Sequence, residues 1–281
     1  MPSKKYYPVQ RTLSMTHPDP VANILKLDVP RYLSQVNHRL YRQSRTYDCS
    51  IKIDANVADG TTVDVYALAD TWYLKGALKL AKTAWDHSNA EEIMINNGKV
   101  ARWSDFRLDI NVNGAGDASV NQFDTYTLNP NSFLGVGEFD FSAVVDQAGA
   151  TRFFVLGNPG ASGYDIIEEY NEQSGTNTDP TVPATGPYSG LLPGLDAAAA
   201  TAISERGNNP PYSADGYGGG IWVKVGTLHL ASGRQRLSTG FFRAPLGAIV
   251  LTGVGAVPSA EIQVEVKSGD YKGVMSHNML E

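Results

Sequence analysis

The chain has 281 residues, of which 19% are charged, and it contains 28 glycines, 15 prolines and a single cysteine, Cys49. This length suffices to bury a full hydrophobic core, and one cysteine excludes an internal disulfide framework and any zinc site with several cysteines. The first 15 residues lack the apolar core of a signal peptide. No apolar run approaches the roughly 20 residues that cross a bilayer, so we expect a soluble protein without a membrane span.

The charge is distributed unevenly along the chain. Residues 1–45 hold eight of the 23 Lys and Arg residues but two of the 29 Asp and Glu residues, so this segment carries +6 in a chain of net charge −6. Such an asymmetry is typical of a basic tail that faces a polyanion. The alternative interpretation is a short, solvated N-terminal segment whose basic residues bind no partner.

The first predicted elements are an extended arm and a short helix. Residues 1–28 carry four prolines and no clear periodicity, which indicates an extended arm. Pro30 suits the first turn of a helix, and the apolar residues after it share one face, so we predict a short basic helix over 29–44. The basic residues of this region are the candidates to face nucleic acid: Lys4, Lys5, Arg11, Arg31, Arg39, Arg42 and Arg45.

Strand patterns and a long helix come next. In CSIKID, residues 49–54, apolar and polar residues alternate as in a half-buried strand, and TTVDVYALA continues the β pattern. A helical insertion over about 70–96 follows, with Asp70 as the predicted N-cap. One apolar stripe at helical spacing predicts a packing role for this helix: Leu74, Ala77, Leu78, Ala81 and Trp85.

The second half of the chain returns to β patterns around a long loop. The segments RLDINVN, FDTYTL, FLGVGEFDFSAVV and TRFFVLG are each typical of strands, whereas YDIIEEY is ambiguous between strand and helix. Glycine and proline are frequent from 157 to 220, which predicts a long surface loop that contains one helix at LDAAAATAISE. Three clean strand patterns end the chain, of which AEIQVEVKSG has the most regular alternation.

These elements predict an all-β fold. About ten strand-like runs at short spacing are typical of a β-sandwich or jelly roll, and helices do not alternate with strands as a parallel α/β sheet requires. We therefore expect a basic N-terminal arm over 1–45 and one jelly-roll β-sandwich over 46–281, with the helical insertion and the surface loop. The alternative, a double jelly roll, would need about sixteen strands.

No arrangement of residues requires catalysis, and we predict no enzyme, cofactor or metal site. The five histidines are scattered, and Cys49 alternates with Ile51 and Ile53 as a small buried residue would. Paired acids could hydrolyse glycosides if they faced each other across a cleft. The candidates for that chemistry are Glu138 and Asp140, or the acids of YDIIEEY.

Aromatic residues are concentrated around the helical insertion. They are predicted to form a local core or, in an assembly, contacts between subunits, since aromatic residues are enriched at interfaces. The residues are Trp72, Tyr73, Trp85, Trp103 and Phe106.

Several segments together resemble the capsid proteins of small single-stranded DNA viruses with circular, Rep-encoding genomes. They are the proline-rich basic N-terminus, DVYALADTWYLKGALKLAKTAW, KVARWSDFRLD and GFFRAPLGAIVLTG, so that the likeness covers roughly residues 60–110 and 235–255. The resemblance implies a single jelly roll whose copies tile an icosahedral shell around a genome. The chain departs from many such proteins because it lacks a dense arginine-rich arm.

The leading hypothesis is therefore a viral coat protein, assembled inside the host cell and located in the virion. Its expected partners are copies of itself, genomic DNA and a host surface receptor. A lectin-like or fibre-type β-sandwich that binds a ligand is the first alternative, and a glycan-active β-enzyme that uses the acids named above is the second.

Overall fold

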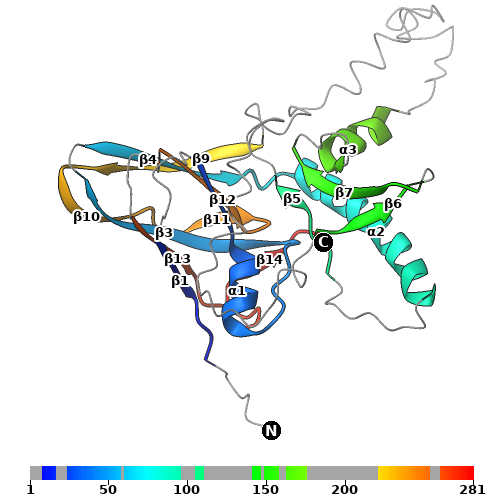
Figure 1. The fold of residues 1–281 in the computed structure, drawn as a ribbon, viewed down its shortest axis with the longest axis horizontal. Helices are drawn as coiled ribbons and strands as arrows, with labels where there is room; N and C mark the ends of the chain where they lie inside the picture. Colours follow the sequence, from blue (N-terminus) through cyan, green and yellow to red (C-terminus); the bar gives the residue numbers. More distant parts are fainter. Residues whose placement is uncertain are drawn as a thin grey trace, which may run out of the picture.

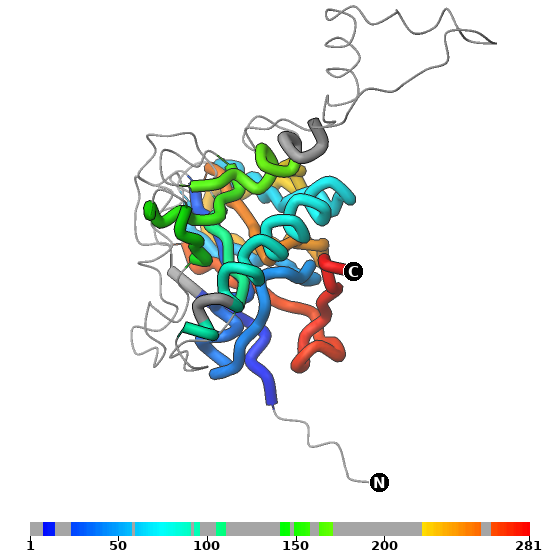
Figure 2. The backbone as a smooth tube through the Cα atoms, turned by 90° about the vertical axis from the view of Figure 1, so that its right-hand side faces the viewer, coloured from blue at the N-terminus to red at the C-terminus, as the bar shows by residue number. Residues whose placement is uncertain are grey.

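The computed structural model describes residues 8–16, 24–57, 60–95, 105–110, 141–146, 149–157, 163–175, 221–253 and 260–281. This part of the chain is mostly β, with two antiparallel sheets that pack face to face on one side of the molecule and an α/β insertion on the other (Figure 1). The view in Figure 2 has the insertion toward the viewer, in front of the sandwich.

The longest strand, β3, is the centre of the first sheet. It has 13 residues and pairs along one side with β10 and β11, and along the other with β13 and β14, while β1 pairs with the outer side of β13. The predicted alternation at 49–54 is confirmed, since Cys49, Ile51 and Ile53 are buried. The strands are β1 (Thr12–Thr16), β3 (Arg45–Val57), β10 (Gly233–Ser238), β11 (Phe242–Pro245), β13 (Glu261–Val266) and β14 (Ser276–Asn278).

The second sheet has the strand order β2-β12-β4-β9, all antiparallel. Its strands are β2 (Ile24–Asp28), β4 (Thr61–Leu68), β9 (Trp222–Leu230) and β12 (Ala248–Thr252). Buried side chains of both sheets form one hydrophobic cluster, so the two sheets are the layers of a sandwich. The contributing residues include Leu13, Ile51, Ile53, Val63, Val65, Leu228, Ile249, Leu251, Ile262 and Val264.

The N-terminal region differs from the predicted arm. Strands β1 and β2 belong to the two sheets, and α1 (Val29–Asn37) packs into the same core, so the described residues between 8 and 45 are part of the sandwich. The arm prediction is therefore wrong for these residues: the prolines indicated an extended arm, although polar and apolar residues alternate in TLSMT. The helix is also shorter than 29–44: His38 adopts a left-handed conformation (φ 51°) and ends it.

The chain between β4 and β9 forms the insertion, which has its own core. In it β7 pairs with β6 in antiparallel and with β5 and β8 in parallel, and both helices pack beside this small sheet (Figure 1). The elements are α2 (Trp72–Ile95), β5 (Asp109–Ile110), β6 (Ala143–Val145), β7 (Thr151–Leu156), β8 (Gly163–Asp165) and α3 (Ile166–Gly175). The insertion is thus more extensive than the predicted 70–96.

Part of the predicted surface loop, residues 157–220, belongs to this insertion. YDIIEEY is the end of β8 followed by the start of α3, and Ile166 and Ile167 are buried, so a plain surface loop from 157 is wrong for residues 163–175. The strand FDTYTL and the helix LDAAAATAISE lie outside the described residues, as does most of FLGVGEFDFSAVV.

The long helix α2 confirms the predicted stripe. Leu74, Ala77, Leu78, Ala81 and Trp85 are all buried in the core of the insertion. The cap differs from the prediction, because the hydroxyl of Thr71, and not the carboxylate of Asp70, accepts a hydrogen bond from the backbone N–H of Leu74 (3.2 Å). Asp70 instead forms a 2.7 Å ion pair with Lys75.

Candidate functional site

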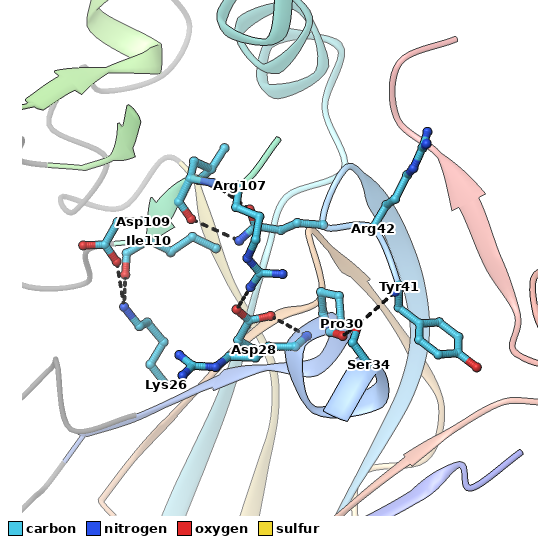
Figure 3. A network of polar contacts seen from close by, with 12 residues as sticks. Lys26, Asp28, Pro30, Ser34, Tyr41, Arg42, Arg107, Asp109 and Ile110 are labelled. Carbon is cyan, nitrogen blue, oxygen red and sulfur yellow. Dashed lines mark hydrogen bonds and ion pairs between the residues drawn. The ribbon is translucent and has the colours of Figure 1, made fainter. Parts of the chain in front are cut away.

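A buried ion pair joins the insertion to the sandwich. The side chain of Arg107 is almost fully buried, and its Nη2 lies 2.5 Å from Oδ2 of Asp28 at the start of α1 (Figure 3). The other carboxylate oxygen of Asp28 accepts a hydrogen bond from the backbone N–H of Arg31 (3.1 Å). One carboxylate therefore caps α1 and also anchors the segment that contains Arg107.

Two more contacts hold this segment in place. Nζ of Lys26 lies 3.3 Å from Oδ1 of Asp109 and donates a hydrogen bond to the carbonyl oxygen of Ile110 (Figure 3). The side-chain amide of Gln43 exchanges two hydrogen bonds with the backbone of Leu108, at 3.1 and 2.8 Å. Residues 107–110 are thus fixed against both β2 and the segment that follows α1.

The segment after α1 lies against a turn near the C-terminus. Nζ of Lys272 donates a hydrogen bond to the carbonyl oxygen of Leu40, and the backbone N–H of Arg42 donates one to the hydroxyl of Tyr271 (3.3 Å). These contacts bring together four cationic residues from two distant parts of the chain. We call them the cationic cluster: Arg39, Arg42, Arg45 and Lys272.

Aromatic side chains support the cationic cluster. The guanidinium carbon of Arg45 lies 3.9 Å from the ring centre of Tyr271, and Nε of Arg45 donates to the hydroxyl of Ser276 at 2.8 Å. The rings of Tyr41 and Tyr271 meet edge to face, with centroids 6.1 Å apart. Arg45 is therefore engaged in holding the turn, and Lys272 also lies near these rings, with Nζ 5.9 Å from the centre of Tyr41 and 5.5 Å from that of Tyr271.

The members of the cationic cluster repel one another. Partial burial, and next the charge of Arg42, lower the pKa of Lys272, and Arg39 and Arg45 act in the same direction. The carboxyl of Asp105 opposes this effect: its Oδ1 lies 4.0 Å from Nε of Arg42. Burial raises the pKa of Asp105 to about 6, although Arg107 and Arg42 lower it.

The predicted nucleic-acid-facing residues are partly brought together. Arg39, Arg42 and Arg45 belong to the cationic cluster, whereas Arg31 is 8% exposed and buried in the first turn of α1, which contradicts the prediction for that residue. Arg11 is exposed at the start of β1, and Lys4 and Lys5 lie outside the described residues. Lys272 is a member that the sequence analysis missed, because nothing in its local sequence indicates the contact with a segment more than 200 residues earlier.

The aromatic candidates have different environments. Tyr73, Trp85 and Phe106 are buried in the core of the insertion, and Phe106 contacts Phe154 with ring centroids 5.3 Å apart. Trp72 is 66% exposed at the start of α2. Trp103 lies outside the described residues.

Of the acids considered for catalysis, the structure describes Asp165, Glu168 and Glu169. Glu138 and Asp140 lie outside the described residues. Asp165 is buried and accepts a hydrogen bond from the backbone N–H of Ile167 (2.9 Å), so it caps α3, and burial raises its pKa to about 7. Glu168 and Glu169 are exposed in the first turn of that helix, where a negative charge is favourable.

No group of three or more His, Cys, Asp or Glu side chains within the described ranges could hold a metal ion. Among the helices that the structure describes, none combines the length and the apolar character needed to span a membrane. Comparisons of the chain with protein-family models, with curated proteins and with solved structures found no match.

Proposed function

We propose that this chain is a viral coat protein with a jelly-roll fold, copies of which form an icosahedral shell around a nucleic-acid genome. The pairing of the sandwich strands is the observation that carries the proposal. In the described part of the chain, ten strands form the two sheets; among them β11 continues the pairing of β10 along β3, and β14 is a strand of three residues that also pairs with β3. The other eight strands, taken in chain order, are β1, β2, β3, β4, β9, β10, β12 and β13.

The eight strands pair in a nested order. The first pairs with the last, the second with the seventh, the third with the sixth and the fourth with the fifth. This is the order produced when one long antiparallel hairpin is rolled into two sheets. It supports a double-sheet jelly roll, an architecture found in viral capsid domains and in lectin domains.

The charge distribution supports a nucleic-acid partner. The cationic cluster collects four positive charges on a chain of net charge −6, next to Tyr271, which Arg45 covers at 3.9 Å. Binding of Lys and Arg to phosphates is favoured by the release of counterions. In a shell the charge of one subunit is multiplied by the number of copies, so a moderate charge per subunit is enough.

The segments that resemble coat proteins are also neighbours in the fold. DVYALADTWYLKGALKLAKTAW forms β4 and α2, and GFFRAPLGAIVLTG forms β11 and β12. Strand β12 pairs with β4, and Nη1 of Arg243 lies 3.7 Å from Oδ2 of Asp70. The two resembling segments therefore form a single region at the junction of sandwich and insertion.

The proposal is tested by purifying the full chain and measuring its mass by light scattering, together with negative-stain electron microscopy. We expect megadalton particles that protect nucleic acid from nuclease digestion. A small, discrete oligomer at high protein concentration, with no protected nucleic acid, would contradict the coat function and favour the lectin-like or fibre-type alternative.

The structure also determines which truncation is informative. Removal of residues 1–28 would delete β1 and β2 and would disrupt both sheets. Removal of residues 2–7 deletes Lys4 and Lys5 and leaves both strands complete. We expect this shorter variant to assemble but to retain less nucleic acid per particle, measured as the ratio of absorbance at 260 and 280 nm after nuclease treatment.

A further inference from the structure

We propose that Arg42 and Lys272 form a phosphate-binding site for nucleic acid on the folded body of the subunit, with Asp105 as its resident counterion. The identity of the ligand rests on the proposed coat function, whereas the anion site itself rests on the geometry of the described residues.

The first observation is that these two cations are poorly neutralised. Most ion pairs of the described residues are close, such as Arg107 with Asp28 at 2.5 Å, Lys224 with Asp64 at 2.7 Å and Arg152 with Asp146 at 3.0 Å. Among the described residues, the carboxylate that pairs with Arg42 is that of Asp105 at 4.0 Å, and the side chain of Arg42 is 58% exposed.

Lys272 is in a similar situation. Its ammonium group donates to the carbonyl oxygen of Leu40, and within the described ranges no carboxylate forms an ion pair with it. In Figure 3 the side chain of Arg42 points away from the Asp28–Arg107 pair. The charge of Arg42 is thus directed outward and remains available to an incoming anion.

The second observation is that the backbone segments that carry the two cations are held in place. The turn that carries Lys272 is closed by hydrogen bonds between Tyr271 and Val274, at 3.1 and 3.0 Å. Arg45 stacks on Tyr271 and bonds to Ser276, and the hydroxyl of Tyr271 accepts from the backbone of Arg42. A site whose donors are preorganised loses less conformational entropy when it binds.

The third observation concerns Asp105. Its Oδ2 is buried and has no hydrogen-bond partner, and its Oδ1 makes the long contact with Arg42. A phosphate offers several anionic oxygens and can accept two parallel hydrogen bonds from a guanidinium group. Phosphate can therefore compete with this carboxylate for Arg42.

Ionisation of Asp105 controls the net charge of the site. The pKa of this carboxyl depends on its burial and on Arg107, Arg42, the backbone of Gln43 and Lys82. The carboxyl in turn raises the pKa values of Lys272 and Tyr47. Its pKa of about 6 means that Asp105 is ionised at pH 7.5 and protonated at pH 5. The site gains one unit of positive charge on acidification, so it should bind phosphate more tightly at pH 5.

The site is tested by fluorescence anisotropy with a short, labelled single-stranded DNA and the full-length protein. The variant Arg42→Gln with Lys272→Gln is compared with the control Lys79→Gln with Arg234→Gln, which removes the same charge from exposed positions elsewhere. Thermal melting verifies that both variants fold.

We expect the site variant to bind about tenfold more weakly and to reduce the slope of log affinity against log salt by about 1.4, since each phosphate contact on a single strand contributes ~0.7. The control should change affinity by less than about twofold, because its charges lie outside the site. An equal loss in both variants would mean that net charge alone binds DNA and would overturn the proposal.

Asp105→Asn tests the counterion. At pH 7.5 it should bind DNA more tightly than the wild type, whereas at pH 5 the two proteins should bind alike, so that its binding depends less on pH. His38, beside Arg39 at the end of α1, is present in both proteins, so any contribution from it cancels. If the affinity of Asp105→Asn for DNA varies with pH as that of the wild type does, Asp105 is not part of the site.

Two further measurements distinguish DNA from a small anion as the ligand, and the anion site from the coat function. Inorganic phosphate that displaces DNA at an equal concentration of phosphate groups would indicate a small-anion site and would overturn the nucleic-acid assignment. If the wild type forms shells but the site variant binds DNA normally, this inference fails and the coat function stands. If the wild type forms a small oligomer while the site variant still loses anion binding, the coat function fails and the site stands.

Discussion

Arg107 and Asp28 form the buried link between the two parts of this molecule, with Nη2 2.5 Å from Oδ2. Asp28 ends β2 and caps α1, whereas Arg107 belongs to the insertion. A single ion pair thus connects the start of a helix in the sandwich to a segment that is almost 80 residues later in the chain.

Replacement of Arg107 by Met should lower the free energy of unfolding by about 3–5 kcal/mol, since it leaves the Asp28 carboxylate in a largely buried site without its partner. Urea denaturation measures the loss. The matched control is Arg243→Met, whose guanidinium is mostly exposed and 3.7 Å from Asp70, and which should cost less than about 1 kcal/mol. If the two variants lose similar stability, the buried pair does not join the two parts.

Leu78→Asp should destabilise the insertion by more than ~3 kcal/mol, because it removes a buried leucine from the core and places an unpaired charge there. The neighbouring Lys79 is exposed, and Lys79→Ala should stay within about 0.5 kcal/mol of the wild type. Thermal melting followed by circular dichroism compares the two. An unchanged melting temperature in Leu78→Asp would mean that α2 does not pack on the insertion.

Gly76 marks the close approach of α2 and α3. A Cβ at this position would lie 2.7 Å from the hydroxyl oxygen of Tyr170 and 2.8 Å from its Cζ. Gly76→Ala should therefore destabilise the protein, although the same change in an open helix stabilises by about 1 kcal/mol. In a Tyr170→Ala background the sign should reverse, and urea denaturation of the four proteins measures both effects. A destabilising effect of the same size in both backgrounds would exclude Tyr170 as the cause.

The stability of the protein should fall as the pH rises from 5 to 8. Burial raises the pKa of Asp105 to about 6 and that of Asp165 to about 7, whereas an Asp in an unfolded chain titrates near ~3.9. Between these values the folded state binds more protons than the unfolded state, so the free energy of unfolding decreases as the pH increases. Urea denaturation should give a loss of roughly 1–4 kcal/mol over this range.

The double variant Asp105→Asn with Asp165→Asn should flatten that dependence. Asp54 and Asp64 act in the opposite direction, because hydrogen bonds to cationic side chains lower their pKa. Their contribution is present above the pKa of the unfolded carboxyl and is lost below about pH 4, so it does not interfere between pH 5 and 8. A pH dependence of the double variant equal to that of the wild type would exclude the two buried acids as its source.

Cys49 should resist thiol reagents in the folded protein. It is fully buried in β3, and burial raises the pKa of its thiol, so that the reactive thiolate is scarce. Labelling with a chromogenic disulfide should be slow in buffer and complete in denaturant. Rapid stoichiometric labelling of the native protein would show that the sandwich opens easily around β3.

The sequence predicted those elements whose apolar residues follow one period over several turns or strand positions. The alternation in CSIKID and in AEIQVEVKSG matches β3 and β13, and the stripe from Leu74 to Trp85 is the buried face of α2. It did not predict β1 and β2, because the four prolines of residues 1–28 indicated an extended arm and outweighed the short alternation of these strands. It left YDIIEEY open between strand and helix, and in the structure the strand ends at Asp165 and the helix begins at Ile166, where both isoleucines are buried in the core of the insertion.

The sequence by itself determined the periodic amphipathic elements, the burial of Cys49 and the positive charge of the N-terminal region, because these are properties of residues close together in the chain. Tertiary structure decided which charges act together. It buried Arg31, brought Lys272 near Arg42 and placed Asp105 beside Arg42. Contacts of this kind join segments hundreds of residues apart, and their electrostatic energy depends on distance and burial, which no local pattern of residues encodes.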